Sequence, residues 1–294
     1  MIRLLRVKKF YPIGIKGSVL VILTLMLLVG DGTSSLGQQS TGTIQSLTFE
    51  SQILATNGFD AERRLKVYLP PGYESSEERY PVLYMIHGHT ANERSFLSQS
   101  NFLGMPSPMN VLYENLLADG EAVSMIIVFP NVNRTEDPAT DKPHEDHIAQ
   151  EIVPFIDETY RTLTDRTNRL IGGHSRGAAD AITISLEYPE LFSLVGSLAT
   201  GPVQRFGDLP RTLITSHNQD EFPLDLYVLV GQTDNLVILG KEIRDWNDEL
   251  DALLSTTEIS YEYVEIFGDH LSILTRGINR MLQHFAVQLT TSAE

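Results

Sequence analysis

Gly173-His174-Ser175-Arg176-Gly177 joins two segments of different character. The apolar run before it, Leu170-Ile171-Gly172, is typical of the end of a buried strand, and the Ala-rich stretch 178–186 after it is typical of a helix. A strand, a tight turn and a helix in this order lift Ser175 above the end of a sheet in a strained backbone conformation. Both flanking glycines are needed because a Cβ atom there would strike the neighbouring strand or helix. This context, more than the five residues themselves, indicates a rigidly held serine nucleophile.

Extended apolar runs alternate with helical patterns along most of the chain. We expect strands at 46–54, 64–69, 82–86, 124–129, 194–198, 224–230 and 261–266. We expect further helices at 110–117, 148–160 (bent by Pro154), 239–253 and 274–285. Segment 131–147 is a predicted polar loop, and segment 200–223 is expected to form a small cap. The alternation predicts an α/β fold with a mostly parallel central sheet, helices on both faces and a minimal cap.

The first 37 residues have the layout of a secretory signal peptide. Five basic residues end at Lys16, an uncharged apolar block spans 17–30, and a stretch of small residues reaches Gly37. The 14 residues of the block are fewer than the roughly 20 that a membrane span needs, so we favour cleavage over a retained membrane anchor. We therefore expect a signal peptide at 1–37, a flexible lead-in at 38–45, one α/β domain at 46–294, and export to the periplasm or the exterior.

The mature chain is strongly acidic and contains no cysteine. Removing residues 1–37 takes away five basic residues and one acidic residue, so the formal net charge changes from −16 to −20. Such a surface repels nucleic acid and anionic lipid, and neither is an expected partner. The absence of cysteine excludes disulfides, a thiolate nucleophile and a lipoprotein-type anchor.

Three side chains suited to acyl transfer follow predicted strands in the order serine, aspartate, histidine. Asp234 follows the strand that ends at Val230, and His270 follows the strand that ends at Ile266. A serine nucleophile needs a base to take its proton and an acid to hold that base in the right tautomer. Carboxyl ends of parallel strands meet at one edge of a sheet, where ligands bind. We therefore predict a catalytic triad of Ser175, Asp234 and His270.

Simpler interpretations exist for each member. Ser175 could be a small residue in a Gly-rich turn, and His270 could be a surface histidine. Other aspartates compete for the role of the acid: Asp220, Asp225 and Asp269. The first two lie at the wrong end of their strand, and the third adjoins the base too closely to face its ring, so Asp234 is favoured.

Backbone N–H groups are expected to bind the oxyanion. The candidates are the N–H of Arg176, at the start of the helix, and that of His89, in the loop after the strand at 82–86. The side chain of His89 could instead contact substrate. We interpret His87 and His174 as residues that brace these loops.

His144-Glu145-Asp146-His147 raises the question of a metal site. Its histidines are three residues apart instead of the four in H-E-x-x-H, and no third ligand is evident. We therefore predict no metal and no organic cofactor, and we interpret Asp146 as a helix cap. Asn133-Arg134-Thr135 is a glycosylation sequon, which matters only in a eukaryotic secretory pathway.

Several blocks in the right order resemble the putative-esterase family of α/β hydrolases, over about residues 60–287. They are Val67–Tyr73, Tyr80–Tyr84 leading into His87-Gly88, Glu151–Ile156 with Tyr160–Thr162, and the pentapeptide around Ser175. The family includes feruloyl and acetyl-xylan esterases, siderophore esterases, S-formylglutathione hydrolase and mycolyltransferases. Position by position, the resemblance implies Ser175 as nucleophile, Asp234 as acid and His270 as base. Ala178 and Asp269 replace glycines found in many members, and neither change removes a catalytic group.

The residues and the resemblance together predict an exported serine carboxylesterase that acts on a small-molecule or polysaccharide-linked ester through an acyl-enzyme. Two alternatives stay open. One is acyl transfer to a sugar or lipid hydroxyl, as in the mycolyltransferases of the family it resembles, and the other is a non-catalytic binding protein that keeps the α/β-hydrolase fold.

Overall fold

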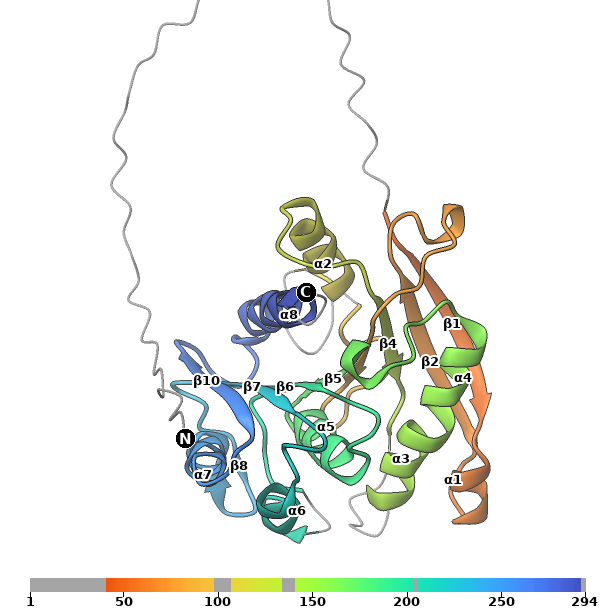
Figure 1. The fold of residues 1–294 in the computed structure, drawn as a ribbon. Coiled ribbons are helices and arrows are strands. Elements are labelled where there is room, and N and C mark those ends of the chain that lie inside the picture. The colour runs from red at the N-terminus through yellow and green to blue at the C-terminus, as the bar shows by residue number, and fades with distance from the viewer. Residues whose placement is uncertain (1–40, 98–106, 134–140, 204–205, 292–294) are drawn as a thin grey trace, which may run out of the picture.

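An eight-stranded sheet in the order β1-β2-β4-β3-β5-β6-β7-β10 forms the centre of the molecule (Figure 1). The structure is a computed structural model and describes residues 41–97, 107–133, 141–203 and 206–291, so the predicted signal peptide lies outside the described residues. The strands are β1 Thr43–Glu50, β2 Glu62–Leu69, β3 Val82–Ile86, β4 Ile126–Pro130, β5 Arg169–His174, β6 Leu194–Leu198, β7 Asp225–Gly231 and β10 Ser260–Ile266.

The six strands β4, β3, β5, β6, β7 and β10 run parallel to one another, whereas β2 is antiparallel to both of its neighbours, β1 and β4. Every residue of β3, β4, β5 and β6 is buried. Strands that are covered on both faces consist mostly of apolar residues, and this composition is what predicts them from the sequence. The sheet confirms the predicted α/β fold class, and it brings six carboxyl ends to one edge.

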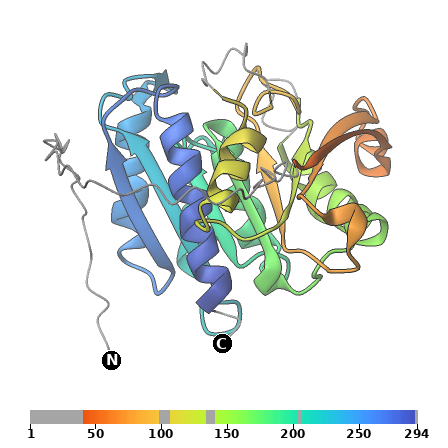
Figure 2. The same ribbon diagram turned by 90° about the horizontal axis from the view of Figure 1, so that it is seen from above.

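Helices cover both faces of the sheet (Figures 1 and 2). On one face, α5 (Arg176–Glu187) packs on β3, β5 and β6, and α7 (Ile243–Leu254) packs on β7. On the other, α8 (Leu274–Thr291) packs on β6 and β7 and against α2 (Met109–Ala118). The predicted apolar stripe of the last helix is buried in full: Leu274, Ile278, Met281, Leu282 and Phe285.

A helical run beside β2 differs from the prediction. Part of the expected polar loop is helical, because α3 spans Asp141–His147; it continues into a π-helical turn, Ile148–Ile152, and into α4, Val153–Thr159. The N–H of Val153 bonds to the carbonyl of Ile148, five residues back. Pro154 lacks an N–H and its ring crowds the carbonyl four residues earlier, so the wider turn before it relieves that clash.

The N-terminal part of the domain also differs. β1 begins at Thr43, so the last residues of the predicted flexible lead-in are paired with β2. The strand expected over 46–54 stops at Glu50, and Gln52–Thr56 forms α1. Ser51 ends the strand because its Oγ accepts a hydrogen bond from the N–H of Leu54 and caps the helix.

Leu239 does not belong to a helix, contrary to the prediction for 239–253. It lies at the tip of a hairpin formed by β8 (Val237–Ile238) and β9 (Lys241–Glu242), and α7 starts after this hairpin. Within the predicted cap, α6 (Arg211–Ser216) packs against α5 and α7, so this part of the segment extends the helical layer. Among the described residues, no helix has the length and apolar character that a membrane crossing requires.

Candidate active site

Ser175 occupies a sharp turn between β5 and α5. Its φ of 57° and ψ of −120° lie in a region that costs a non-glycine residue about 1–3 kcal/mol. A Cβ atom on Gly173 would lie 2.3 Å from the carbonyl carbon of Gly177, and one on Gly177 would lie 2.3 Å from the carbonyl oxygen of Ile86. The two glycines therefore make this turn possible, and the serine is held where the helix begins.

Asp234 and His270 meet beyond the carboxyl ends of the neighbouring strands β7 and β10. Nδ1 of His270 lies 2.9 Å from Oδ2 of Asp234, which is 0 % exposed. Since a carboxylate only accepts, Nδ1 carries the proton and Nε2 of the neutral ring is unprotonated. The aspartate predicted from the order along the chain is therefore the one that contacts this histidine.

The competing aspartates have other partners. Asp225 binds Nε2 of His284 at 2.6 Å and the hydroxyl of Ser260 at 2.6 Å, at the opposite end of β7. Asp269 is exposed and accepts hydrogen bonds from the backbone N–H groups of Leu271 and Ser272. Asp225 thus supports the sheet and α8, and Asp269 shapes the turn around the histidine.

His174 links the turn at Ser175 to His270. Its Nε2 lies 2.9 Å from the backbone carbonyl oxygen of His270, and the two ring centroids are 4.5 Å apart. Burial, and secondarily the neighbouring His270, lowers the pKa of His174 to about 3. The predicted base therefore lies against the residue that immediately precedes the predicted nucleophile.

The loop after β3 carries the second predicted oxyanion donor. His89 and Arg176 both line one cavity of about 180 Å³, whose walls are His87, Gly88, His89, Thr90, Val132, Asn133, Arg176 and Asp180. The N–H of Val132 donates to Nε2 of His87 at 3.0 Å, so Nδ1 of His87 is protonated and donates to the carbonyl of Gly88 at 2.9 Å. His87 thus braces the loop, as the sequence indicated.

Gly88 in this loop lies directly over the turn at Ser175. A Cβ atom on Gly88 would lie 3.3 Å from the Cβ of Ser175 and 3.2 Å from the carbonyl oxygen of His174. The loop after β3 and the turn after β5 are therefore in van der Waals contact. This contact brings the predicted oxyanion donors and the predicted nucleophile to the same place.

Comparison with known proteins identifies the family of this chain. The family model named Putative esterase matches residues 56–255. The chain belongs to the putative esterase family. It is 32% identical over 174 residues to the endo-1,4-beta-xylanase/feruloyl esterase of Xylanibacter ruminicola, covering 54% of this chain and 22% of that protein. It is 27% identical over 149 residues to S-formylglutathione hydrolase of Arabidopsis thaliana, covering 47% of this chain and 52% of that protein.

This family member thus spans about a fifth and about half of the lengths of those two relatives. A solved ferulic acid esterase from Anaeromyces mucronatus has the same fold, with a TM-score of 0.63 at 24% identity, covering 84% of this chain and 92% of the other. The predicted family and the α/β-hydrolase fold are therefore confirmed. The family match and these relatives support a carboxylic ester hydrolase.

Arg176 has a partner that the sequence did not reveal. Its Nη2 lies 2.7 Å from Oδ1 of Asp141, which is buried at the start of α3. This ion pair ties α3 to the first residue of α5, beside the turn at Ser175. Because 35 residues separate the partners, neither periodicity nor spacing pointed to this contact.

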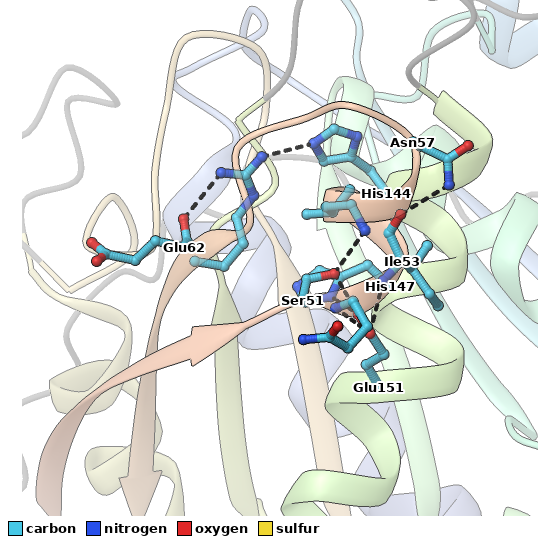
Figure 3. A network of polar contacts seen from close by, with 10 residues as sticks. Ser51, Ile53, Asn57, Glu62, His144, His147 and Glu151 are labelled. Atoms are coloured by element: carbon cyan, nitrogen blue, oxygen red, sulfur yellow. Dashed lines mark hydrogen bonds and ion pairs between the residues drawn. The ribbon is translucent and has the colours of Figure 1, made fainter.

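His144 and His147 belong to an internal polar network at α1, α3 and β2 (Figure 3). Nε2 of His144 lies 3.4 Å from Nη2 of Arg63, and Nδ1 of His147 lies 2.7 Å from Oε2 of Glu151. The other carboxylate oxygen of Glu151 accepts from the first N–H groups of α1. Within the described ranges, no group of three or more His, Asp or Glu residues is arranged to hold a metal ion.

The interpretation of Asp146 as a helix cap is wrong. Asp146 lies inside α3, where its carboxylate pairs with Lys142 one turn away and accepts a hydrogen bond from the hydroxyl of Tyr188. In the described part of the chain, the helix already includes Asp141, five residues before Asp146. A polar stretch whose partners come from elsewhere in the chain was mistaken for a loop.

Proposed function

We propose that this member of the putative esterase family is a serine carboxylesterase that works through an acyl-enzyme. Ser175 is the nucleophile, His270 the general base and Asp234 the acid that orients the base. The observation that most strongly supports this proposal is the hydrogen bond of 2.9 Å between buried Asp234 and Nδ1 of His270. It supports a base whose Nε2 is available to take a proton from a serine hydroxyl.

In the first half-reaction, Nε2 of His270 takes the proton of Ser175 as Oγ bonds to the ester carbonyl carbon. Backbone N–H groups of Arg176 and His89 stabilise the negative charge on the carbonyl oxygen. The imidazolium then gives its proton to the departing alcohol. Water repeats these steps on the acyl-enzyme and releases the carboxylic acid, and the cycle needs no metal or organic cofactor.

We further propose that the substrate is a small-molecule or polysaccharide-linked ester and that the mature chain is exported. The 32% identical xylanase/feruloyl esterase supports an ester carried by a polysaccharide. The signal-peptide layout of residues 1–37 supports export. The net charge of −16 disfavours strongly anionic substrates.

Turnover of p-nitrophenyl butyrate by the mature chain tests the nucleophile. Ser175→Ala is expected to lower kcat by a factor of about 10³ or more, because it removes the attacking oxygen. Ser216→Ala, an exposed serine at the end of α6, is the matched control and should keep the activity of the wild type. Full activity in Ser175→Ala would refute the proposal.

Replacement of the acid tests the orientation of the base. Asp234→Asn is expected to lower kcat by about 10³–10⁴, because an amide can hold His270 in the wrong tautomer. Asp269→Asn changes the exposed aspartate next to the base and is expected to change kcat by less than about tenfold. If Asp269→Asn lowers kcat more than Asp234→Asn does, the assignment of Asp234 as the acid is wrong.

A panel of esters tests the substrate class. We expect hydrolysis of methyl ferulate, p-nitrophenyl acetate and a feruloylated xylan oligosaccharide, with the highest kcat/KM for the oligosaccharide. If free ferulate is released from methyl ferulate and none from the oligosaccharide, the polysaccharide-linked substrate is excluded while the esterase activity stands.

A further inference from the structure

His174 is an internal side chain of the candidate site, and the proposed mechanism leaves it without a role. It is 2 % exposed and lies between the turn at Ser175 and the segment 267–272, which carries the base and is called the base turn below. Two contacts join it to His270: the hydrogen bond of 2.9 Å to the backbone carbonyl and the ring contact at 4.5 Å.

The protonation state of His174 follows from its surroundings. A carbonyl oxygen only accepts, so Nε2 of His174 carries the proton and donates. Burial keeps the ring neutral, since it lowers the pKa to about 3. Nδ1 is buried without a hydrogen-bond partner among the described residues, and it faces the loop at Gly88, where an added Cβ would lie 3.4 Å away. His174 is therefore a neutral donor of a single hydrogen bond.

The base turn is also fixed on its other side. The N–H of Thr233, next to the acid, donates to the carbonyl of Gly268 at 3.0 Å. Within the turn, the N–H of Asp269 donates to the hydroxyl of Ser272 at 2.8 Å. These bonds connect the base to the acid and to its own turn, whereas the bond from His174 connects the base to the turn that carries Ser175.

A neutral donor suits this position better than a cation. His270 becomes an imidazolium each time it takes a proton, and a second positive charge 4.5 Å from its ring would oppose that step. A lysine or arginine at residue 174 would supply a donor together with such a charge. A buried neutral imidazole supplies the donor alone.

We propose that His174 is a positioning residue, which holds the base turn and with it the His270 ring against the nucleophile through its neutral Nε2–H donor. The inference rests on the proposed serine esterase mechanism. Because His174 acts through the backbone of His270, its loss moves the base relative to Ser175 without removing a reacting group. A displacement of about 1 Å between reacting groups costs up to about 100-fold in rate.

The amide variants form a matched pair for the test. In His174→Gln the amide nitrogen takes the place of Nε2 and keeps the donor to the carbonyl of His270, whereas in His174→Asn it takes the place of Nδ1. With p-nitrophenyl butyrate, we expect His174→Gln to keep kcat within about threefold and His174→Asn to lower it about 10- to 100-fold. KM should change by less than about threefold in both variants. The kcat values are calculated per active site, and the number of active sites is measured by labelling with a fluorophosphonate.

Equal kcat values in the two variants, whether both are high or both low, would overturn the inference, because the donor at Nε2 would then not matter. If His174→Asn does not fold, His174→Leu, which fills the space of the ring without a donor, takes its place in the comparison with His174→Gln. A wild-type protein that neither hydrolyses the ester nor reacts with the fluorophosphonate contradicts the proposed function instead.

Discussion

Single residues store backbone strain around the candidate site. Thr90, Ser175 and Ala199 have φ values of 60°, 57° and 53°. They follow β3, β5 and β6, so the strained residues lie at the carboxyl ends of three adjacent strands. Hydrogen bonds to neighbouring strands hold two of them: the N–H of Ser175 donates to Leu198 and that of Ala199 donates to Leu229. Strain maintained by the scaffold is typical of a preorganised site.

At this scale, Gly88→Ala should reduce activity more than stability. The new methyl group would press on the Cβ of Ser175 and on the carbonyl of His174, at 3.3 and 3.2 Å. We expect kcat for p-nitrophenyl butyrate to fall about tenfold, because the proposed nucleophile, Ser175, moves by a few tenths of an ångström. Kinetics and thermal denaturation of the purified variant measure the two effects.

Gly172→Ala is the matched control for that experiment. Its methyl group would be equally crowded, 3.1 Å from the carbonyl oxygen of Gly196 and 3.3 Å from the sulfur of Met281, but on the side of the sheet under α8. We expect it to cost about 1 kcal/mol of stability and to leave kcat within about twofold. If both variants lose kcat equally, the crowding of Ser175 is not the cause.

Among the elements, the hairpin β8–β9 carries an unfavourable residue at its tip. Leu239 and Gly240 have φ values of 51° and 79° and form a two-residue loop between paired Ile238 and Lys241. Such a loop favours Asn-Gly, because both central residues need positive φ. Leu239 is also 62 % exposed, so little buried apolar surface offsets its strain.

Leu239→Asn should therefore stabilise the protein, by about 0.5–1 kcal/mol. Urea denaturation gives the change in the free energy of unfolding. Leu236→Asn is the control, because Leu236 is also exposed, at 45 %, and does not have a positive φ. A similar gain in both variants would show that exposure of a leucine, and not the turn, limits stability.

Elements buried on both faces were predictable, and elements held together by polar contacts were not. β3 has the predicted bounds because it is a short apolar run between Pro81 and His87, and β6, whose residues are all buried, also has the predicted bounds. α3 was missed because Asp141 and His144 are polar yet buried, and their partners Arg176 and Arg63 are far away in the sequence. The contact of His174 with His270, the proposed base, could not be predicted for the same reason, because 96 positions separate the two residues.

At the scale of the whole molecule, the partly buried side chain of His284 holds the C-terminal helix to the sheet as a cation. His284 of α8 lies 2.6 Å from Asp225 of β7 and 3.4 Å from Glu262 of β10. Burial acts to lower the pKa of His284, but hydrogen bonds and charges from these carboxylates outweigh it and raise the pKa to about 9. The ring is therefore charged at neutral pH.

This cation makes stability depend on pH in the alkaline range. Because the pKa in the folded protein is above the ordinary value of 6.5, the contribution of His284 is complete below about pH 6.5 and is lost as the pH rises through about 9. The shift corresponds to about 3 kcal/mol. Urea denaturation at pH 6 and pH 9.5 should show that His284→Gln costs far more stability at pH 6. A cost that does not change with pH would mean that the ring contributes packing and no charge.

The order of the strands has a consequence for the newly made protein. The turn at Ser175 is complete once β3, β5 and β6 have assembled, whereas Asp234 and His270 follow β7 and β10, the last strand of the described sheet. A chain that folds from its amino-terminal side would therefore form the turn at Ser175 before the proposed base is in place. Ester-cleaving ability is then expected only once β10, and with it His270, has joined the sheet.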